Sequence, residues 1–554
     1  MPDTASAGRN HGRGLLNRRA LIWPLLFIVA LPLVMLLLSW LDSQPEIWAH
    51  LRQFVLPRLI GHTLLMLVVV GVGVVVLGVG LAWMSACCEY PGRRWLDPLL
   101  VLPLAFPTYV LAFIYLGMFD FAGPVQSLWR EWFDATPWLL PALSQPHGVL
   151  LILILAFYPY VYLLARASFM TGGLSAFEAA RSLGVGPVGT FFRVCVPAAR
   201  PAIAVGLALA LMETLADFGA VAIYGFDTFT TAIYRTWFGL FNLAAAAQLA
   251  SILMLFMLVL VLAERFSRGQ RQRQAERQPK AYRIVLRGPP AWAATLAQML
   301  VVVIAVVLPL VQLLIWSWPM LPALFDGGFN RVILNTMGLG LAGALAVVAG
   351  GFLLLLATHR AGRRAGLLGE IAAIGYAIPG TVLAVAIMLA LIGLDRVAGT
   401  ALAGGLLALI LAYLIRFLRV AWGPLDGVAG RIRPEYGEVA RSLGVSRWQR
   451  LWRVDLPLLW PGVVTAFLLA LVEVAKEMPA TLMMRPFGWD TLAIRIFELT
   501  TEGQWQMAAL PALILVVLGA LPVIILIRGT TPTRSPRPAS ERVRNAGESA
   551  MNPI

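Results

Sequence analysis

Charged residues, cysteine and histidine are all scarce in this chain of 554 residues. Only 13% of the residues are charged, three are cysteine and five are histidine. The cysteines, Cys87, Cys88 and Cys195, lack metal-site spacing and have no histidine nearby, so neither a disulfide nor a zinc site is predicted. The histidines are scattered, and no nucleophile motif accompanies them. We therefore expect no catalytic residue, and the sequence assigns no metal site.

A phosphate-binding loop is also missing. The pattern G-x-x-x-x-G-K-[ST], whose backbone amides cradle nucleotide phosphates, occurs nowhere in the chain. We therefore expect that this chain binds no cofactor and does not itself hydrolyse ATP.

Apolar residues dominate the sequence instead. They make up 60% of the chain, and the mean hydropathy is +0.81. A helix that crosses about 30 Å of hydrocarbon needs roughly 20 apolar residues, and backbone groups inside lipid must be hydrogen-bonded within the protein. The sequence therefore predicts an all-α polytopic membrane protein with twelve transmembrane helices. These are expected at 21–41, 62–86, 97–119, 148–168, 201–223, 242–263, 292–316, 334–357, 368–391, 399–418, 460–482 and 505–527.

The basic residues fix an orientation. The net charge is +15, and nearly all the basic residues are arginine. If the N-terminus is cytoplasmic and the twelve spans alternate, most of the basic residues lie on the same side of the membrane as the N-terminus. This is the distribution that the positive-inside rule requires. The charge thus reflects topology rather than nucleic-acid binding. Residues 1–20 are expected to be a cytoplasmic segment; the alternative, a cleaved signal peptide, is disfavoured because the apolar run is long and lacks a small-residue cleavage site.

Two short stretches of the sequence nearly repeat each other. "EAARSLGVGPVGTFFRVCVP" (178–197) and "EVARSLGVSRWQRLWRVDLP" (438–457) match at 10 of their 20 positions. The similarity continues outside them: "HTL" corresponds to "NTM", "PTYVLA" to "PGTVLA", and "FDTF" to "WDTL". Such internal repetition indicates two homologous halves.

Each half contains six spans, so both insert with the same orientation and are expected to be related by a pseudo-two-fold axis along the membrane normal. We expect the first half at 21–263 and the second at 291–527. Between them lies a basic cytoplasmic linker, 264–290, and a cytoplasmic tail, 528–554, is expected to be disordered.

The repeated stretches follow the fourth span of each half. Ser175 is a plausible N-cap with Glu178 in capping-box position, and Gly184 permits a turn with positive φ. A second short helical piece is expected to end at Pro197, with Pro201 beginning the next span. A plain helical hairpin would explain these features, but not the near-identity of the two copies. We therefore favour a short helix that docks on a cytoplasmic partner.

These residues resemble the EAA loop of ABC importer permeases. The first copy has Glu178, Ala179, Ala180, Gly184 and Pro197; the second has Glu438, Val439, Ala440, Gly444 and Pro457, where Val439 departs from the pattern. The resemblance covers essentially the whole chain. It implies the type I importer fold, alternating access, and loops that act as coupling helices on a homodimer of ATP-binding cassette subunits, which would carry ATP and Mg. It also implies a periplasmic binding protein and a location in the bacterial inner membrane, with both termini cytoplasmic.

Five ionisable residues fall within the predicted fifth spans: Glu213, Asp217, Glu473, Lys476 and Glu477. A charge in the bilayer costs about 2.5–3.5 kcal/mol on insertion scales, so each is a candidate for the translocation path. The acids form i, i+4 pairs, and each pair is expected to share a helix face. Structural ion pairing is the alternative. An ion-coupled secondary transporter could use the same acids, but it would leave the repeated loop unexplained.

The stretches at 91–113, 213–239 and 474–500 are similar to ferric-iron ABC permeases with fused halves. This resemblance implies Fe3+ as cargo, and hard oxygen ligands suit such an ion. Related permeases carry thiamine, sulfate, molybdate, polyamines or phosphonates, and the intramembrane acids do not exclude these.

Overall fold

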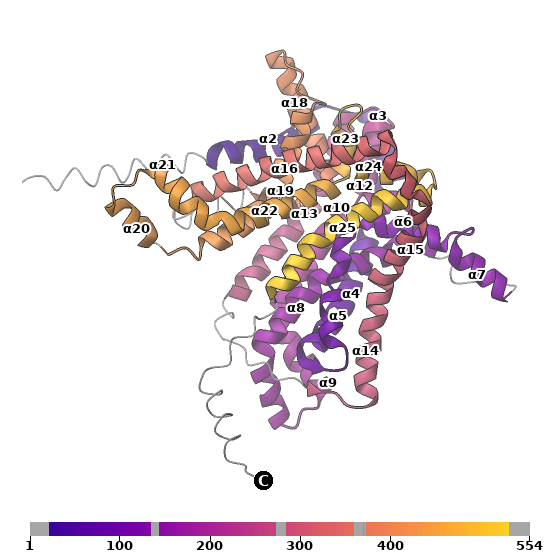
Figure 1. The fold of residues 1–554 in the computed structure, drawn as a ribbon. Helices are drawn as coiled ribbons and strands as arrows, with labels where there is room; N and C mark the ends of the chain where they lie inside the picture. Colours follow the sequence, from indigo (N-terminus) through magenta and orange to yellow (C-terminus); the bar gives the residue numbers. More distant parts are fainter. Residues whose placement is uncertain are drawn as a thin grey trace, which may run out of the picture.

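The computed structural model describes residues 22–133, 143–272, 284–358, 369, 373–433 and 435–530, and it is almost entirely helical (Figure 1). The predicted N-terminal segment, the middle of the linker and most of the tail lie outside the described residues. At the linker's edges, helix α13 (Leu243–Gln272) extends past residue 264, and strand β2 (Ile284–Val285) pairs with β1 (Cys88–Glu89). At the start of the tail, the last helix continues to Thr530.

Among the described residues, twelve helical segments are long and apolar enough to cross a membrane. The prediction of an all-α protein with twelve spans is confirmed. In the first half, the main helices are α2 (Ile22–Leu38), α4 (Leu56–Cys87), α6 (Thr108–Phe119), α8 (Val149–Ser182), α10 (Val196–Ala216) and α13 (Leu243–Gln272). In the second half, they are α14 (Pro289–Val302), α15 (Leu308–Ser317), α16 (Gly327–Thr358), α18 (Gly380–Ala398), α19 (Leu406–Ala429), α22 (Leu456–Lys476) and α25 (Trp505–Thr530).

Shorter helices connect these spans. They are α3 (Pro45–His50), α5 (Arg93–Leu99), α7 (Pro124–Phe133), α9 (Pro187–Thr190), α11 (Gly219–Ile223), α12 (Phe229–Phe238), α20 (Glu435–Ser442), α21 (Arg447–Arg450), α23 (Pro479–Met484) and α24 (Leu492–Thr501).

The two halves exchange their first spans. Helices α4, α8 and α10 pack together in one bundle, and α16, α19 and α22 pack together in the other. However, α2 packs on α18 of the second half, and α15 packs on α6 of the first as well as on α25 of its own half. The Tyr115 hydroxyl on α6 donates a hydrogen bond to the Ile304 carbonyl, which lies between α14 and α15. In Figure 1 the α9 end of the first bundle and the α20–α21 end of the second lie far apart, so the bundles diverge toward these ends.

Prolines move the start of two spans. Helix α6 begins at Thr108 and α18 at Gly380, each directly after a proline with an extended ψ of 142°. The predicted starts at 97 and 368 are therefore wrong. The residues before α6 form α5 and a 3-10 turn, η3 (Leu102–Ala105), because Pro103 and Pro107 lack the N–H groups that a continuous helix needs.

Four other prolines lie inside continuous helical segments and follow a wide turn: Pro57, Pro197, Pro309 and Pro457. Each π-helical turn in the described residues ends two residues before a proline, because a wider turn relieves the clash of the proline ring with the preceding carbonyl. These turns are η2 (Leu51–Val55), η6 (Phe191–Cys195), η7 (Val303–Val307) and η10 (Leu451–Asp455). The expectation that a helical piece ends at Pro197 is therefore wrong, because the span runs from Val188 through Pro197 to Ala216.

The first EAA loop also differs from expectation upstream. Ser175 lies inside α8, which runs unbroken to Ser182, so the predicted N-cap is wrong. In the second copy α19 ends at Ala429 and the separate helix α20 begins at Glu435. The second copy has Pro434 where the first has Leu174. A proline disfavours helical conformation at the residue before it.

Candidate functional site: a polar cavity between the halves

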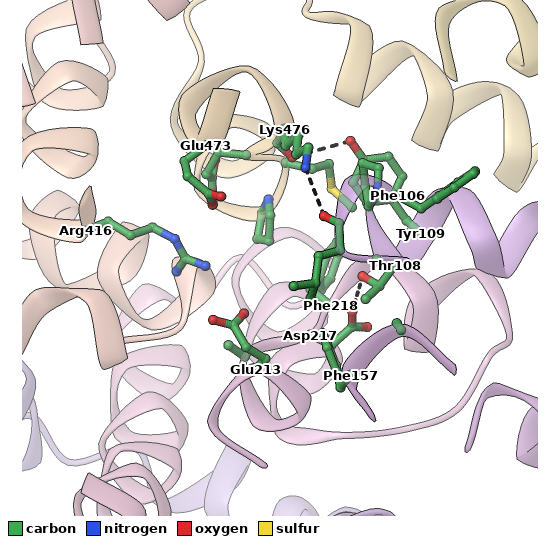
Figure 2. A pocket seen from close by; sticks show the side chains of 18 of the residues that line it. Phe106, Thr108, Tyr109, Phe157, Glu213, Asp217, Phe218, Arg416, Glu473 and Lys476 are labelled. Atoms are coloured by element: carbon green, nitrogen blue, oxygen red, sulfur yellow. Dashed lines mark hydrogen bonds between the residues drawn. The ribbon is translucent and has the colours of Figure 1, made fainter. Parts of the chain in front are cut away.

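A cavity of about 170 Å³ lies where the two halves meet. Its lining includes the ionisable residues that the sequence singled out, and it draws on α6, α8 and α10 of the first half and on α19 and α22 of the second. Figure 2 shows four ionisable side chains directed toward this space from three helices: Glu213 from α10, Arg416 from α19, and Glu473 and Lys476 from α22. The structure thus brings the five candidate path residues together.

Both fifth spans end just before their second acid. Helix α10 stops at Ala216, and Asp217 has an extended ψ of 132°. Helix α22 stops at Lys476, and Glu477 has a ψ of 120°. The expectation that each acid pair shares one helix face is therefore wrong, because the chain leaves the helix between the two acids.

The second acid of each pair instead caps the short helix that follows. The Asp217 carboxylate accepts hydrogen bonds from the amides of Ala220 (3.1 Å) and Val221 (3.2 Å), at the start of α11. The Glu477 carboxylate accepts hydrogen bonds from the amides of Ala480 and Thr481, both at 2.9 Å, at the start of α23. These bonds satisfy amides that have no partner within their helix, so a buried acid is stable at a broken span.

The first acid of each pair lies on the last turns of its span. The Tyr376 hydroxyl, from η9 (Ala373–Ala377) of the second half, donates a 3.0 Å hydrogen bond to Glu213 of the first. The side chain of Glu473, its counterpart, makes no hydrogen bond to the described residues. Lys476 donates to the Leu104 carbonyl of the first half at 3.3 Å. Each fifth span therefore contacts the segment before the third span of the opposite half.

Arg416 on α19 also lines the cavity, and the sequence analysis did not select it. Its guanidinium donates a 2.8 Å hydrogen bond to the Ile378 carbonyl and lies between Glu213 and Glu473 in Figure 2. The signal was available, since Arg416 falls inside the predicted span 399–418. The lining also includes three tyrosines, Tyr109, Tyr160 and Tyr376, and no charge marked them in the sequence.

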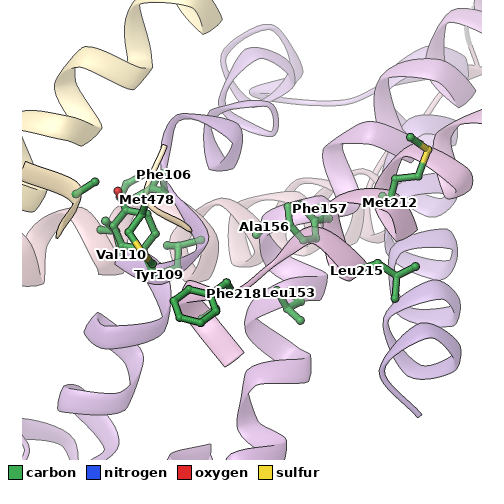
Figure 3. Close-up of a cluster of buried hydrophobic side chains, with 14 of the residues drawn as sticks. Phe106, Tyr109, Val110, Leu153, Ala156, Phe157, Met212, Leu215, Phe218 and Met478 are labelled. Atoms are coloured by element: carbon green, nitrogen blue, oxygen red, sulfur yellow. The ribbon is translucent and has the colours of Figure 1, made fainter. Parts of the chain in front are cut away.

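Apolar side chains close the cavity beside the broken helices. Phe218 and Met478 occupy equivalent positions, directly after the two capping acids, and both are buried. Figure 3 shows them among buried side chains that include Phe106 and Tyr109. Gly219 is required here, because a Cβ at this position would lie 2.7 Å from the Cβ atom of Tyr109, which is fixed by its own backbone.

The repeated motifs HTL/NTM and FDTF/WDTL make equivalent contacts in the outer loops of the two halves. The His62 ring nitrogen Nδ1 lies 3.1 Å from the Asp227 carbonyl, and the Asn335 amide donates to the Asp490 carbonyl at 3.1 Å. The carboxylate of Asp227 pairs with Arg58 and Arg235.

The two EAA loops lie on the opposite side of the spans. Gly184 and Gly444 have φ values of +76° and +71°, as predicted for the first copy and repeated in the second. The preceding residues, Leu183 and Leu443, are 81% and 74% exposed. In the second loop Ala440 is buried and Glu438 is exposed. Glu178, Ala179 and Ala180 form the end of α8.

A buried polar network fastens the second half to the first near these loops. Arg93 pairs with Asp97 at 3.0 Å, and Arg166 approaches the same carboxylate at 3.4 Å. Burial raises the pKa of the Asp97 carboxyl above its ordinary value, although the neighbouring Arg166 and Arg93 lower it. Gln298, from α14 of the second half, donates to the Ser85 hydroxyl at 3.3 Å. No local pattern in the sequence indicates this network.

Two matched bundles of apolar helices around a polar cavity, with exposed loops on one side, define a membrane transport subunit. The chain belongs to the family described as the binding-protein-dependent transport system inner membrane component, whose model matches residues 75–272 and 346–531. It is therefore an ABC importer permease with two fused halves, and a transport subunit rather than an enzyme. Members of this family work with an ATPase and a periplasmic binding protein.

Individual relatives differ in how much of the chain they match. The Fe(3+)-transport system permease protein FbpB 2 of Haemophilus influenzae is 26% identical over 479 residues, which cover 85% of this chain and 89% of that protein. The molybdenum transport system permease protein ModB of Escherichia coli is 29% identical over 203 residues, 35% of this chain and 86% of that protein. The putative 2-aminoethylphosphonate transport system permease protein PhnV of Salmonella paratyphi A is 42% identical over 98 residues, 18% of this chain and 37% of that protein.

Proposed function

We propose that the chain is the permease of an ATP-driven importer for ferric iron, delivered by a periplasmic binding protein across a bacterial inner membrane. The observation that carries the proposal is the similarity to an Fe(3+) permease through both halves, over 85% of the chain. The proposal places both termini in the cytoplasm, and the distribution of arginine supports this orientation.

The EAA loops would couple transport to ATP hydrolysis on a homodimer of ATPase subunits, one subunit under each half, with ATP and Mg bound there. Exposed apolar side chains on both loops support this docking, because exposed apolar clusters mark protein interfaces. In the first loop these are Leu183, Val188 and Phe192; in the second they include Leu443 and Trp448. Closure of the ATPase dimer would bring the loops together and reorient the halves.

The translocation path would run through the central cavity. Glu213 and Glu473 offer one carboxylate from each half, and Tyr160 and Tyr376 add phenolic oxygens, which are hard donors of the kind that a ferric ion prefers. Asp217 and Glu477 would act through the short helices that they cap, and Lys476 through its bond to the first half. Arg416 would balance the carboxylates while no cation is present.

Other cargo remains the principal alternative. The molybdenum and aminoethylphosphonate permeases match part of this chain, and permeases for thiamine, polyamines or other oxyanions share the architecture. An ion-coupled secondary transporter is the alternative from a different class. The acids would fit it, but the paired EAA loops favour the ATP-driven importer.

The cargo is best tested on the cognate binding protein, titrated separately with Fe3+, thiamine, a polyamine and molybdate. We expect tight binding of Fe3+ alone. Tight thiamine binding without iron binding would reject ferric iron as the cargo while leaving the importer architecture intact. Uptake into proteoliposomes that hold the permease without any ATPase would favour the secondary transporter.

A further inference from the structure

A second cavity, of about 330 Å³, lies at the face opposite the EAA loops. It is enclosed by η8 (Trp318–Phe325), the first turns of α16, the helix α24 and the start of α25. Spans seven and eight meet at this point, since one ends at Phe325 and the next begins at Gly327. The cavity belongs to the second half alone and is separate from the central site.

The cavity lies at the level of a membrane–water interface. Trp318 and Phe325 on η8 are 77% and 90% exposed, at the end of a span. Exposed aromatic side chains at span ends mark the headgroup region of the bilayer. The walls are apolar and include Phe329, Val332 and Leu510. Lipid is therefore the medium that borders this cavity.

Opposite charges line the same cavity without pairing with each other. The Asp326 carboxylate is exposed, and within the described parts of the chain it has no ion-pair partner. Arg495 has only a loose contact, 3.8 Å, with Glu498 on its own helix. A third charged residue, Asp490, is held by Arg485 at 2.8 Å. One free carboxylate and one weakly held guanidinium thus remain for a ligand.

We propose that this cavity binds an aminophospholipid, a lipid whose headgroup carries a primary ammonium and a phosphate. The ammonium would pair with Asp326 and the phosphate with Arg495, and both pairs would be charge-assisted hydrogen bonds. The apolar wall would receive the first part of an acyl chain. A volume of about 330 Å³ is at the low end for ligand pockets, roughly 300–1,000 Å³, so the rest of the chains would remain in the bilayer.

The test compares two lipids that differ only in the ammonium group. The full-length protein, purified in detergent and depleted of lipid, is titrated with dioleoyl phosphatidylethanolamine or dioleoyl phosphatidylcholine, and bound lipid is counted by native mass spectrometry. The choline group is quaternary and cannot donate a hydrogen bond to Asp326. We expect a preference of about tenfold for phosphatidylethanolamine. Equal retention of both lipids by the wild-type protein would overturn the proposal.

Three variants localise the effect. Asp326→Asn should abolish the preference for phosphatidylethanolamine, and Arg495→Gln should weaken the binding of both lipids. Arg331→Gln is the matched control, because Arg331 is exposed one turn further along α16 and does not line the cavity. Unchanged lipid binding in the first two variants would contradict the assignment. Complete displacement of the lipid by free phosphoethanolamine would show that the cavity binds a soluble ligand instead. If neither lipid bound and the cavity residues were shielded from solvent only when the periplasmic binding protein was added, the cavity would be a protein interface.

Discussion

A glycine with positive φ occupies the same point of both EAA loops. A Cβ at Gly184 or Gly444 would meet no atom within 4 Å, so the constraint there is the backbone angle rather than space. A β-branched residue in this conformation costs about 1–2 kcal/mol. We expect Gly184→Val combined with Gly444→Val to abolish uptake while the protein level in the membrane is unchanged, as measured by radiolabelled cargo uptake and immunoblotting.

The matched control is Gly186→Val, in the same loop but without a positive φ and also with open space around it. Uptake by this variant should stay near the wild-type level. Normal transport by the double variant would contradict the coupling role of the loops.

The two carboxylates of the cavity that do not cap a helix are the best residue-level test of the path. Glu213→Gln and Glu473→Gln keep the side-chain shape and remove the charge. If these groups attract a cation, uptake should fall about tenfold or more in each variant. Glu46→Gln, an exposed acid outside the cavity, should leave uptake unchanged. Full uptake with both cavity carboxylates neutral would assign them a structural role.

Among the elements, the short helices α11 and α23 depend on acids that belong to the ends of the preceding spans. Replacing such a cap by alanine costs about 1 kcal/mol. In Asp217→Ala the amides of Ala220 and Val221 should therefore exchange hydrogen about fivefold faster. Glu477→Ala should do the same for Ala480 and Thr481. Hydrogen–deuterium exchange measures this directly.

Helix α12 supplies the internal control for these variants, because its own cap, Thr228, is unaltered. Its exchange rate should not change. If α11 and α23 kept their wild-type exchange rates as well, the carboxylates would not be what holds these helices.

The sequence predicted the number of spans, the two halves and the positive φ at the loop glycines, because each depends on local composition or on direct repetition. It misplaced the starts of the third and ninth spans, since hydropathy alone passes over Pro107 and Pro379. It also placed Asp217 and Glu477 on helix faces. That these acids lie beyond a helix end depends on contacts with the next helix, which no local pattern encodes. Arg416 was missed although its charge lay within a predicted span.

At the scale of the whole molecule, the exchanged first spans make each half incomplete by itself. Helix α2 covers α18 of the second half, and α15 covers α6 of the first. A chain divided within 273–283 should therefore assemble only when both fragments are co-expressed. We expect an affinity tag on one fragment to recover the other in equal amount, and the first fragment alone to be degraded or aggregated because apolar surface stays uncovered.

Size-exclusion chromatography of the fragments gives the readout. A cut within α16, for example after Gly350, is the control and should prevent assembly, because it divides a packed span. Independent folding of the first fragment as a stable monomer would show that the exchanged contacts contribute little.

Lys476 has Ala216 as its counterpart in the first half, and Thr108 has Gly380. A channel assembled from two copies of one gene product would have to carry every such substitution twice. Joining the copies end to end guarantees one of each, so the two walls of the passage are free to specialise. A single ammonium group on one wall then makes the electrostatic potential across the passage asymmetric, which a symmetric assembly of two identical copies could not do.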